Sequence, residues 1–205
     1  MIFSYDDKAL EYLKKKDKKL ATVIDLIGPI ERHINPDLFE SLVSSIVAQQ
    51  ISGKAFETMY ARLKAKSPIT PEGILHLSTD DIQSCGMSLK KVSYIQGAAT
   101  YFSHTDIETL KTMTDEALIE HLVQLNGIGR WTAEMLLIFS LNRMDVFSKK
   151  DLAIRRGISM LYHHTKITDT LLDKYHKRYS PYASLASLYL WEISSGRYGQ
   201  VEHQK

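Results

Sequence analysis

The stretch LNGIGRWTAEM, residues 125–135, decides the fold of this 205-residue chain. An apolar helical run ends near Leu125 and another begins at about Arg130, so the chain must reverse direction within a few residues. Gly127 and Gly129 can supply the positive φ angles and close backbone approach that such a turn needs. Amide N–H groups at the start of the second helix lack intrahelical acceptors and suit a phosphate. The stretch therefore predicts either a simple tight turn between helices or a turn that also holds a nucleic-acid backbone.

The segments on both sides of this turn are also predicted to be helical. Asn35-Pro36 has the pattern of an N-cap followed by proline at the first helical position. Start signals of the same kind, and apolar residues at helical spacing, recur along the rest of the chain. The start signals are at Thr70-Pro71, Ser88 and Thr114, and further periodic runs lie at 131–141, 151–162, 169–177 and 181–193. Alternating β patterns are absent from the sequence, so we expect an all-α protein of about ten helices.

Composition narrows the classes of protein that fit the chain. A hydrophobic fraction of 44% can form one substantial core, in one domain or two lobes. No run approaches the roughly 20 apolar residues of a membrane span, and the N-terminus lacks a signal-peptide pattern, so we expect a cytoplasmic protein without a membrane partner. Cys85 is the single cysteine, which excludes an internal disulfide, a Cys-rich zinc site and a four-cysteine iron–sulfur cluster.

The formal net charge of +2 hides an uneven distribution of charge along the chain. Residues 121–180 contain ten Lys or Arg against five Asp or Glu. This modest basic bias suits contact with phosphates, and it is equally typical of a solvated basic surface.

Three longer segments carry a resemblance to a known family. LNGIGRWTAEMLLIFSLNRMDVFSKKDLAIRRG resembles the hairpin and following catalytic aspartate of the helix-hairpin-helix DNA glycosylase superfamily. Within that superfamily it is most similar to the alkylated-base branch, the DNA-3-methyladenine glycosylases II. SLVSSIVAQQIS and GMSLKKVSYIQGAA resemble two further segments of the family, and the matches together span most of residues 38–193.

The resemblance implies how the chain is organised. It implies one glycosylase domain over residues 1–205 with a two-lobed helical fold. One lobe comprises roughly residues 35–140, and the other comprises the N-terminus with residues 141–205. A family-like helix already at Pro36 leads us to expect no N-terminal β domain.

The resemblance also implies the reaction. Bifunctional relatives carry a lysine nucleophile where this chain has Trp131, and an indole cannot form a Schiff base, so a monofunctional enzyme is expected. Asp151 matches the catalytic carboxylate, which would stabilise an oxocarbenium-like transition state and orient or deprotonate the attacking water. Its expected place at a helix N-terminus near Lys149 and Lys150 favours the ionised form. Asp145 matches a structural position that caps a turn.

Other family positions concern the flipped base and the gap that it leaves in the duplex. Trp131 and Tyr182 match aromatic residues of the base pocket, where ring faces attract a cationic purine. Met135 stands where some relatives have a pocket tyrosine, which puts the substrate range in doubt. Gln50 matches the residue that wedges into the duplex, with Gln49 beside it.

The hairpin is implied to bind the DNA backbone and a cation. The backbone contacts would come from Gly127, Ile128, Gly129, Arg130 and Thr132. Relatives often bind a monovalent cation through backbone carbonyls, which here would be those of Leu125 and Ile128. No cofactor is required and no iron–sulfur cluster is expected. The expected partner is damaged double-stranded DNA, bound by a monomer.

The implied function is base excision repair by a monofunctional DNA glycosylase, acting in the cytoplasm on nucleoid DNA. The enzyme would flip out and hydrolyse N-alkylated purines, 3-methyladenine and also 7-methylguanine, and leave an abasic site. Two alternatives stay open: a glycosylase of the same fold for deaminated or mismatched bases, and a non-catalytic helix-hairpin-helix DNA-binding protein. Asp151 argues against the second, because a carboxylate near DNA phosphates would cost a pure binder affinity.

Overall fold

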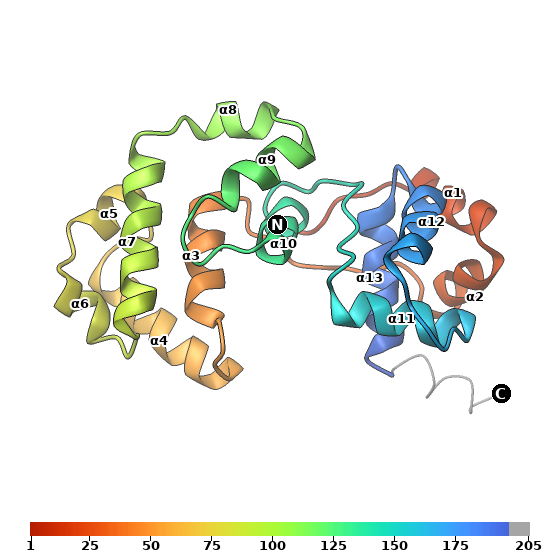
Figure 1. Ribbon diagram of the computed structural model, residues 1–205, viewed down its shortest axis with the longest axis horizontal. Helices are drawn as coiled ribbons and strands as arrows, with labels where there is room; N and C mark the ends of the chain where they lie inside the picture. The colour runs from red at the N-terminus through yellow and green to blue at the C-terminus, as the bar shows by residue number, and fades with distance from the viewer. Residues whose placement is uncertain (197–205) are drawn as a thin grey trace. The chain divides into compact units, whose positions relative to one another are not determined.

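The computed structural model describes residues 1–196, and this part of the chain is almost entirely helical, as predicted (Figure 1). Its regular elements are thirteen α-helices, and it has one isolated antiparallel bridge between Ile2 and His33. None of the helices in residues 1–196 is long and apolar enough to span a membrane. The number exceeds the expected ten because the described chain includes very short helices, among them α6 and α8 with five and six residues. Helices this short complete too few turns to show a periodic pattern.

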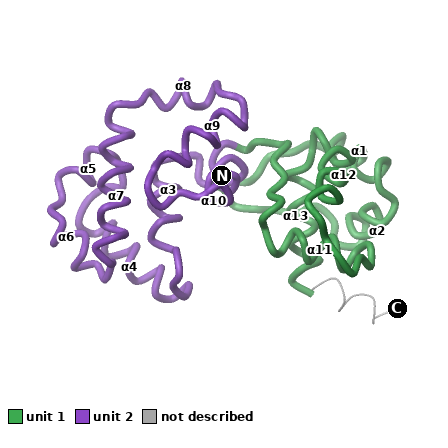
Figure 2. The backbone as a smooth tube through the Cα atoms, in the orientation of Figure 1, with its two compact units in different colours: residues 1–34, 142–205 green, residues 35–141 purple. Residues whose placement is uncertain are grey.

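The described chain divides into two compact units, which are coloured separately in Figure 2. Unit 2 is residues 35–141, and unit 1 combines residues 1–34 with the chain from Asn142 onward. Unit 2 contains α3 (Leu38–Ala48), α4 (Gly53–Lys66), α5 (Pro71–Leu75), α6 (Thr79–Gln83), α7 (Leu89–Ser103), α8 (Ile107–Thr112), α9 (Asp115–Leu122) and α10 (Arg130–Phe139). Unit 1 contains α1 (Asp7–Lys16), α2 (Lys18–Ile27), α11 (Leu152–Tyr162), α12 (Asp169–Tyr179) and α13 (Ala183–Ser194).

In unit 2, α7 is the helix around which the others are organised. It packs against α3, α5 and α6, while α3 also contacts α4 and α10. Phe39 of α3 and Phe102 of α7 have ring centroids 5.4 Å apart in the core. The loop after α3 and the turn between α9 and α10 therefore both connect directly to helices of one core.

In unit 1, α11 and α13 make the closest helix pair. A Cβ on Gly157 of α11 would lie 2.4 Å from the carbonyl oxygen of Leu190 on α13, so only glycine allows this approach. Helix α13 is buried along most of its length, with Leu185, Leu188 and Tyr189 in the core. This packing fixes the start of α11 relative to the C-terminal part of α13.

Several predicted helix starts are confirmed. Thr70, Ser88 and Thr114 are the N-caps of α5, α7 and α9, and each hydroxyl accepts a backbone N–H three residues on. Pro71 occupies the first turn of α5, as the sequence predicted. These signals depend only on contacts within one helical turn, which explains why they could be read directly.

The predicted start at Asn35-Pro36 is wrong. The N-cap of α3 is Asp37, whose carboxylate accepts the N–H of Glu40 at 2.8 Å, and the helix begins at Leu38. The Asn35 side chain instead accepts the N–H of Asp37 at 3.0 Å and donates to the Glu40 carboxylate at 2.9 Å. Two capping residues two positions apart compete, and the carboxylate takes the cap while Asn35 forms the turn before it.

Candidate active site and DNA interface

The turn between α9 and α10 is a compact hairpin held by its own backbone. The N–H of Ile128 donates to the carbonyl of Leu125 at 3.0 Å, and Gly127 has a φ of 86°. Gly129 is the N-cap of α10 with a φ of −90° and no side-chain cap, so the positive φ expected there is wrong. A Cβ on Gly127 would lie 2.2 Å from Cδ2 of Tyr94, whereas a Cβ on Gly129 would meet nothing within 4 Å. Gly127 therefore permits the turn, and Gly129 leaves the helix start uncovered by a side chain.

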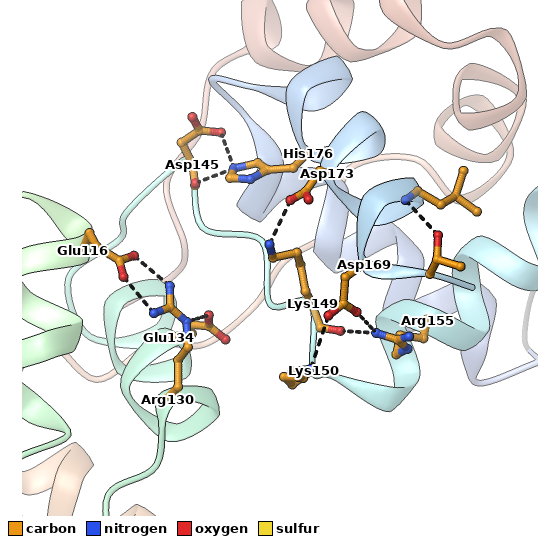
Figure 3. Close-up of polar contacts among 12 residues, drawn as sticks. Glu116, Arg130, Glu134, Asp145, Lys149, Lys150, Arg155, Asp169, Asp173 and His176 are labelled. Carbon is orange, nitrogen blue, oxygen red and sulfur yellow. Dashed lines mark hydrogen bonds and ion pairs between the residues drawn. The ribbon is translucent and has the colours of Figure 1, made fainter. Parts of the chain in front are cut away.

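Arg130, the first residue of α10, is held by two carboxylates. Its guanidinium donates to both oxygens of Glu116 on α9, at 2.8 and 2.7 Å, and its Nε donates to Glu134 at 3.0 Å (Figure 3). The hydrogen bond to Glu116 is the main cause that raises the pKa of Arg130. Arg130 thus joins the two helices of the hairpin, and its charge is compensated within the protein.

The loop that follows α3 is attached to the same hairpin. Gln49 is the C-cap of α3, and its side-chain Nε2 donates to the carbonyl of Gly127 at 2.8 Å. Lys91 of α7 donates to the carbonyls of Val47 and Gln49, each at 2.7 Å. Gln50 has a φ of 57°, in the left-handed region that non-glycine residues rarely adopt. No pattern in the sequence indicates that the loop and the hairpin are joined, although Lys91 lies in the quoted GMSLKKVSYIQGAA segment.

The predicted pocket residues of α10 lie on one side of that helix. Trp131 and Met135 are four residues apart, and such a pair occupies the same helix face. Trp131 is 49% exposed, a large fraction for an indole, while Met135 and Thr132 are half-buried. The ring of Trp131 is therefore accessible from outside the core.

Asp151 is the N-cap of α11 and is only 6% exposed. Its Oδ1 accepts the N–H of Ile154 at 2.8 Å and the indole N–H of Trp191, on α13, at 3.2 Å. Asp151 thus caps its helix, as any aspartate at a helix start can, and it also has a side-chain donor from a distant helix. Sequence reasoning missed Trp191; its one signal is that the chain has only two tryptophans.

The basic residues around Asp151 are largely engaged with other carboxylates (Figure 3). Lys149 pairs with Asp173 at 2.8 Å, and Lys150 pairs with Asp169 at 3.3 Å. Arg155 also contacts Asp169, and its hydrogen bond is the largest cause that lowers the pKa of that carboxyl. Much of the basic bias in the sequence is therefore used to join the loop before α11 to α12.

Tyr182, the second predicted aromatic, packs against the N-terminal helix of unit 1. Its ring meets that of Tyr12 edge to face at 5.2 Å, and the Tyr12 hydroxyl donates to the carbonyl of Ser180 at 2.6 Å. The Asp145 carboxylate accepts the hydroxyl of Ser180 and the N–H of Ala183, which confirms its predicted capping role. Tyr12 is a further aromatic that sequence reasoning missed, because it lies 170 residues from Tyr182.

A family comparison accounts for this combination of hairpin and buried carboxylate. The family model of HhH-GPD superfamily base excision DNA repair proteins matches residues 43–181. The chain belongs to this family. The resemblance read from the hairpin and from the segments around it is thereby confirmed.

Individual relatives of this base excision repair protein cover most of its length. It is 34% identical over 198 residues to DNA-3-methyladenine glycosylase 1 of Schizosaccharomyces pombe, covering 91% of this chain and 87% of the relative. It is 34% identical over 199 residues to the DNA-3-methyladenine glycosylase of Saccharomyces cerevisiae, covering 78% of this chain and 67% of the relative.

Solved structures of similar proteins share the fold of this family member. A DNA-3-methyladenine glycosidase from Bacillus halodurans has a TM-score of 0.87 at 33% identity, covering 98% of this chain and 94% of that chain. The S. pombe 3-methyladenine DNA glycosylase in complex with abasic DNA has a TM-score of 0.77 at 33% identity, covering 92% of this chain and 97% of that chain.

The residues predicted for this repair protein fall into two groups, one in each unit. Unit 2 holds the hairpin, Gln49, Gln50, Trp131 and Met135, and the structure joins the hairpin to the loop of Gln49. Unit 1 holds Asp151 and Tyr182. In the structure, Trp191 contacts Asp151, and Tyr12 contacts Tyr182. No group of three or more His, Cys, Asp or Glu side chains within residues 1–196 could hold a metal ion.

Proposed function

We propose that this protein is a monofunctional DNA glycosylase that removes N-alkylated purines, 3-methyladenine and 7-methylguanine, from duplex DNA. The observation that carries the proposal is the buried Asp151 carboxylate, capping α11 and contacted by Trp191, in a member of a base excision repair family. A cap of this kind can be purely structural, so it is membership of the repair family that supports a catalytic role for this carboxylate. The names of the curated relatives support alkylated bases as substrates.

The carboxylate suits the charge that develops in this reaction. As the glycosidic C–N bond breaks, positive charge builds on the deoxyribose, and an ionised Asp151 stabilises it. Water then forms the new bond to C1′, Asp151 takes up its proton, and the base leaves with the electron pair of the broken bond. The N–H groups of Ile154 and Trp191 hold the carboxylate in place. A purine methylated on a ring nitrogen is already cationic, so it departs as a neutral base without a separate general acid.

Two features concern how the base is bound and what happens to the strand. Trp131 stands where bifunctional relatives have a lysine, so no Schiff base forms and the strand stays intact. Its exposed ring offers an electron-rich face to a cationic purine. Within unit 1, Tyr182 and Tyr12 form a separate aromatic pair. Met135, which stands where some relatives have a tyrosine, affects which bases are accepted, because a thioether makes weaker polar contacts than a phenol.

We propose that the hairpin binds the DNA backbone mainly through main-chain N–H groups. The start of α10 has no side-chain cap at Gly129, and its first-turn amides at Arg130 and Thr132 suit a phosphate. The amide of Gly127 belongs to the same turn, whereas the N–H of Ile128 already donates to the carbonyl of Leu125. Arg130 itself serves as a brace between α9 and α10.

The salt dependence of binding tests this division of roles. A cation that neutralises a phosphate contributes about 0.9 to the slope of log K against log salt concentration. We expect Arg130→Met to leave that slope nearly unchanged and to lower the free energy of unfolding, because Glu116 and Glu134 lose their partner. If the slope of log K against log salt concentration is smaller by about 0.9 for Arg130→Met than for wild type, with unchanged stability, Arg130 contacts a phosphate.

Release of free bases from methylated duplex DNA tests the proposed reaction. Wild type should release 3-methyladenine, while Asp151→Asn should be slower by about 100-fold or more, since the amide cannot stabilise the developing charge. Affinity for DNA containing an abasic site should be retained, because Asn still caps α11. An Asn variant with near wild-type turnover would remove Asp151 from the mechanism. Tight binding without release of any methylated base would redirect the search to deaminated purines.

We also propose that the carbonyl oxygens of Leu125 and Ile128 hold a monovalent cation. The Leu125 carbonyl accepts the N–H of Ile128 and keeps a second lone pair, and hard oxygen donors in a tight turn suit such an ion. The melting temperature should be higher in potassium chloride than in tetramethylammonium chloride at equal ionic strength. Equal melting temperatures would contradict a bound cation.

A further inference from the structure

The ammonium group of Lys91 lies at the C-terminal end of α3. It donates to the carbonyls of Val47 and Gln49, each at 2.7 Å. Carbonyls in the last turn of a helix lack intrahelical donors, and a cation there also interacts favourably with the helix dipole. Lys91 is half-buried, and this burial lowers the pKa of its ammonium group. Lys91 therefore fixes the point at which the chain leaves α3.

Gln49 carries this connection on to the hairpin. Its backbone carbonyl is bound by Lys91, and its side-chain Nε2 donates to the carbonyl of Gly127 at 2.8 Å. Both ends of this residue are thus used within the protein. Gln49 is consequently occupied as a link, which leaves Gln50 as the residue of the pair available to a partner.

Gln50 has a backbone conformation that needs support from its surroundings. Its φ of 57° lies in the left-handed region, which is strained for a non-glycine residue, and such strain persists only where neighbouring contacts enforce it. The contacts next to it are those of Gln49 with Lys91 and with the hairpin. Loss of either contact would allow Gln50 to relax.

Helix α7 contacts the hairpin as well as the loop. Tyr94 lies three residues after Lys91, on the same face of the helix. Its ring packs so closely on Gly127 that any Cβ there would overlap it. One helix face thus sets both the end of α3 and the turn of the hairpin.

We propose that Lys91 and Gln49 are positioning residues that hold Gln50 in its left-handed conformation and fix the loop of residues 49–52 against the hairpin. The inference rests on the proposed glycosylase function and on Gln50 as the residue that fills the gap left by the flipped base. The proposal predicts that the two residues matter for some substrates and not for others. Lys91 and Gln49 are needed when a paired base must be extruded, and they are not needed for hydrolysis of a base that is already unpaired.

Single-turnover release of 3-methyladenine from two duplexes provides the test. In one the lesion is paired normally, and in the other it lies opposite an abasic site, so that no base pair has to be broken. Lys91→Met should slow release from the paired duplex by about tenfold, which corresponds to the loss of one hydrogen bond to a charged group. Release from the duplex with the abasic site should stay nearly unchanged. Gln49→Met, which removes the amide donor at similar length, should act in the same direction.

Two control variants separate positioning from loss of charge. Lys90→Met removes the same charge from the adjacent residue, whose ammonium lies over the Tyr94 ring at 5.8 Å, and should leave both rates unchanged. Lys91→Arg should restore most of the paired-duplex rate, because a guanidinium can donate to both carbonyls. Equal loss on the two duplexes would indicate a general structural role and overturn the proposal. If Lys91→Met does not fold, Gln49→Met carries the same comparison.

A double-mutant cycle with Gln50→Ala completes the test. Once Gln50 is truncated, Lys91→Met should slow the paired duplex no further, since no wedge remains to be positioned. If Gln50→Ala alone leaves the paired-duplex rate unchanged, the wedge and this inference both fail. Base release by wild type and its loss in Asp151→Asn would still establish the glycosylase. If Gln50→Ala slows release and Lys91→Met does not, the wedge stands and the positioning role is wrong.

Discussion

At the scale of single residues, Asp151 combines two demands on one carboxylate. A helix N-cap must accept a backbone N–H, and this fixes the side chain relative to α11. The indole N–H of Trp191 donates to the same Oδ1, at 3.2 Å, and restrains the carboxylate from a second helix. In the proposed reaction, a carboxylate held in this way would meet the developing charge without having to reorganise.

Trp191→Phe isolates the second restraint. Phenylalanine keeps an aromatic ring in the space but has no N–H, so Oδ1 loses one donor. We expect single-turnover base release to fall by about tenfold, with affinity for abasic-site DNA unchanged. Release at the wild-type rate from a correctly folded variant would show that the indole N–H has no part in orienting Asp151.

At the scale of elements, the hairpin depends on different properties of its two glycines. Gly127 combines a positive φ with close packing on Tyr94, which belongs to α7. Gly129 has an extended backbone that any residue adopts, and open space where a Cβ would be. Only Gly127 is required for the hairpin to form.

Substitution of each glycine by alanine should separate these roles. Gly127→Ala should lower the free energy of unfolding by about 1 to 3 kcal/mol, because strain and overlap with Tyr94 add together. Gly129→Ala should stay within about 0.5 kcal/mol of wild type. Urea denaturation of both variants gives the comparison, and equal losses would contradict the distinction.

At the scale of the whole molecule, unit 1 is assembled from the two ends of the chain. Asp17, between α1 and α2, is 4% exposed and accepts hydrogen bonds from Tyr162 and Arg178, both at 2.6 Å. These partners lie 145 and 161 residues further along the sequence. Asp17 also caps α2 through the N–H groups of Lys19 and Leu20. One buried carboxylate thus joins the first 34 residues to α11 and α12.

Asp17→Asn should weaken this long-range connection and leave the cap intact. Asparagine still accepts the backbone N–H groups, but the charge that faces Arg178 is lost. We expect the free energy of unfolding to fall by about 2 kcal/mol, measured by urea denaturation. Asp25→Asn, which removes an exposed partner of Lys14, is the matched control and should have no measurable effect. An equal loss of unfolding free energy in the two variants would contradict the role of Asp17 in joining the two ends of the chain.

Several features of the fold could be predicted because their causes are local. Hydroxyl caps at Thr70, Ser88 and Thr114 and the reversal at Gly127 involve residues within one or two turns of each other. One error was also local: Asp37, two positions after Asn35, caps α3 by accepting the N–H of Glu40, while Asn35 accepts the N–H of Asp37 in the turn before the helix. The short helices α6 and α8 were not predicted, because helices of five or six residues carry no clear periodicity.

The sequence by itself determined the helical fold, the hairpin and the candidate carboxylate, because periodicity, glycine and capping residues act over a few positions. Only the tertiary structure decided that Arg130 braces α9 against α10, that Lys91 and Gln49 join the loop after α3 to the hairpin, and that Trp191 contacts Asp151. Each of these partners comes from a segment 14 to 78 residues away along the chain. Which side chains meet across such separations depends on how the helices pack, and helix packing has no signature in the spacing of residues along the sequence.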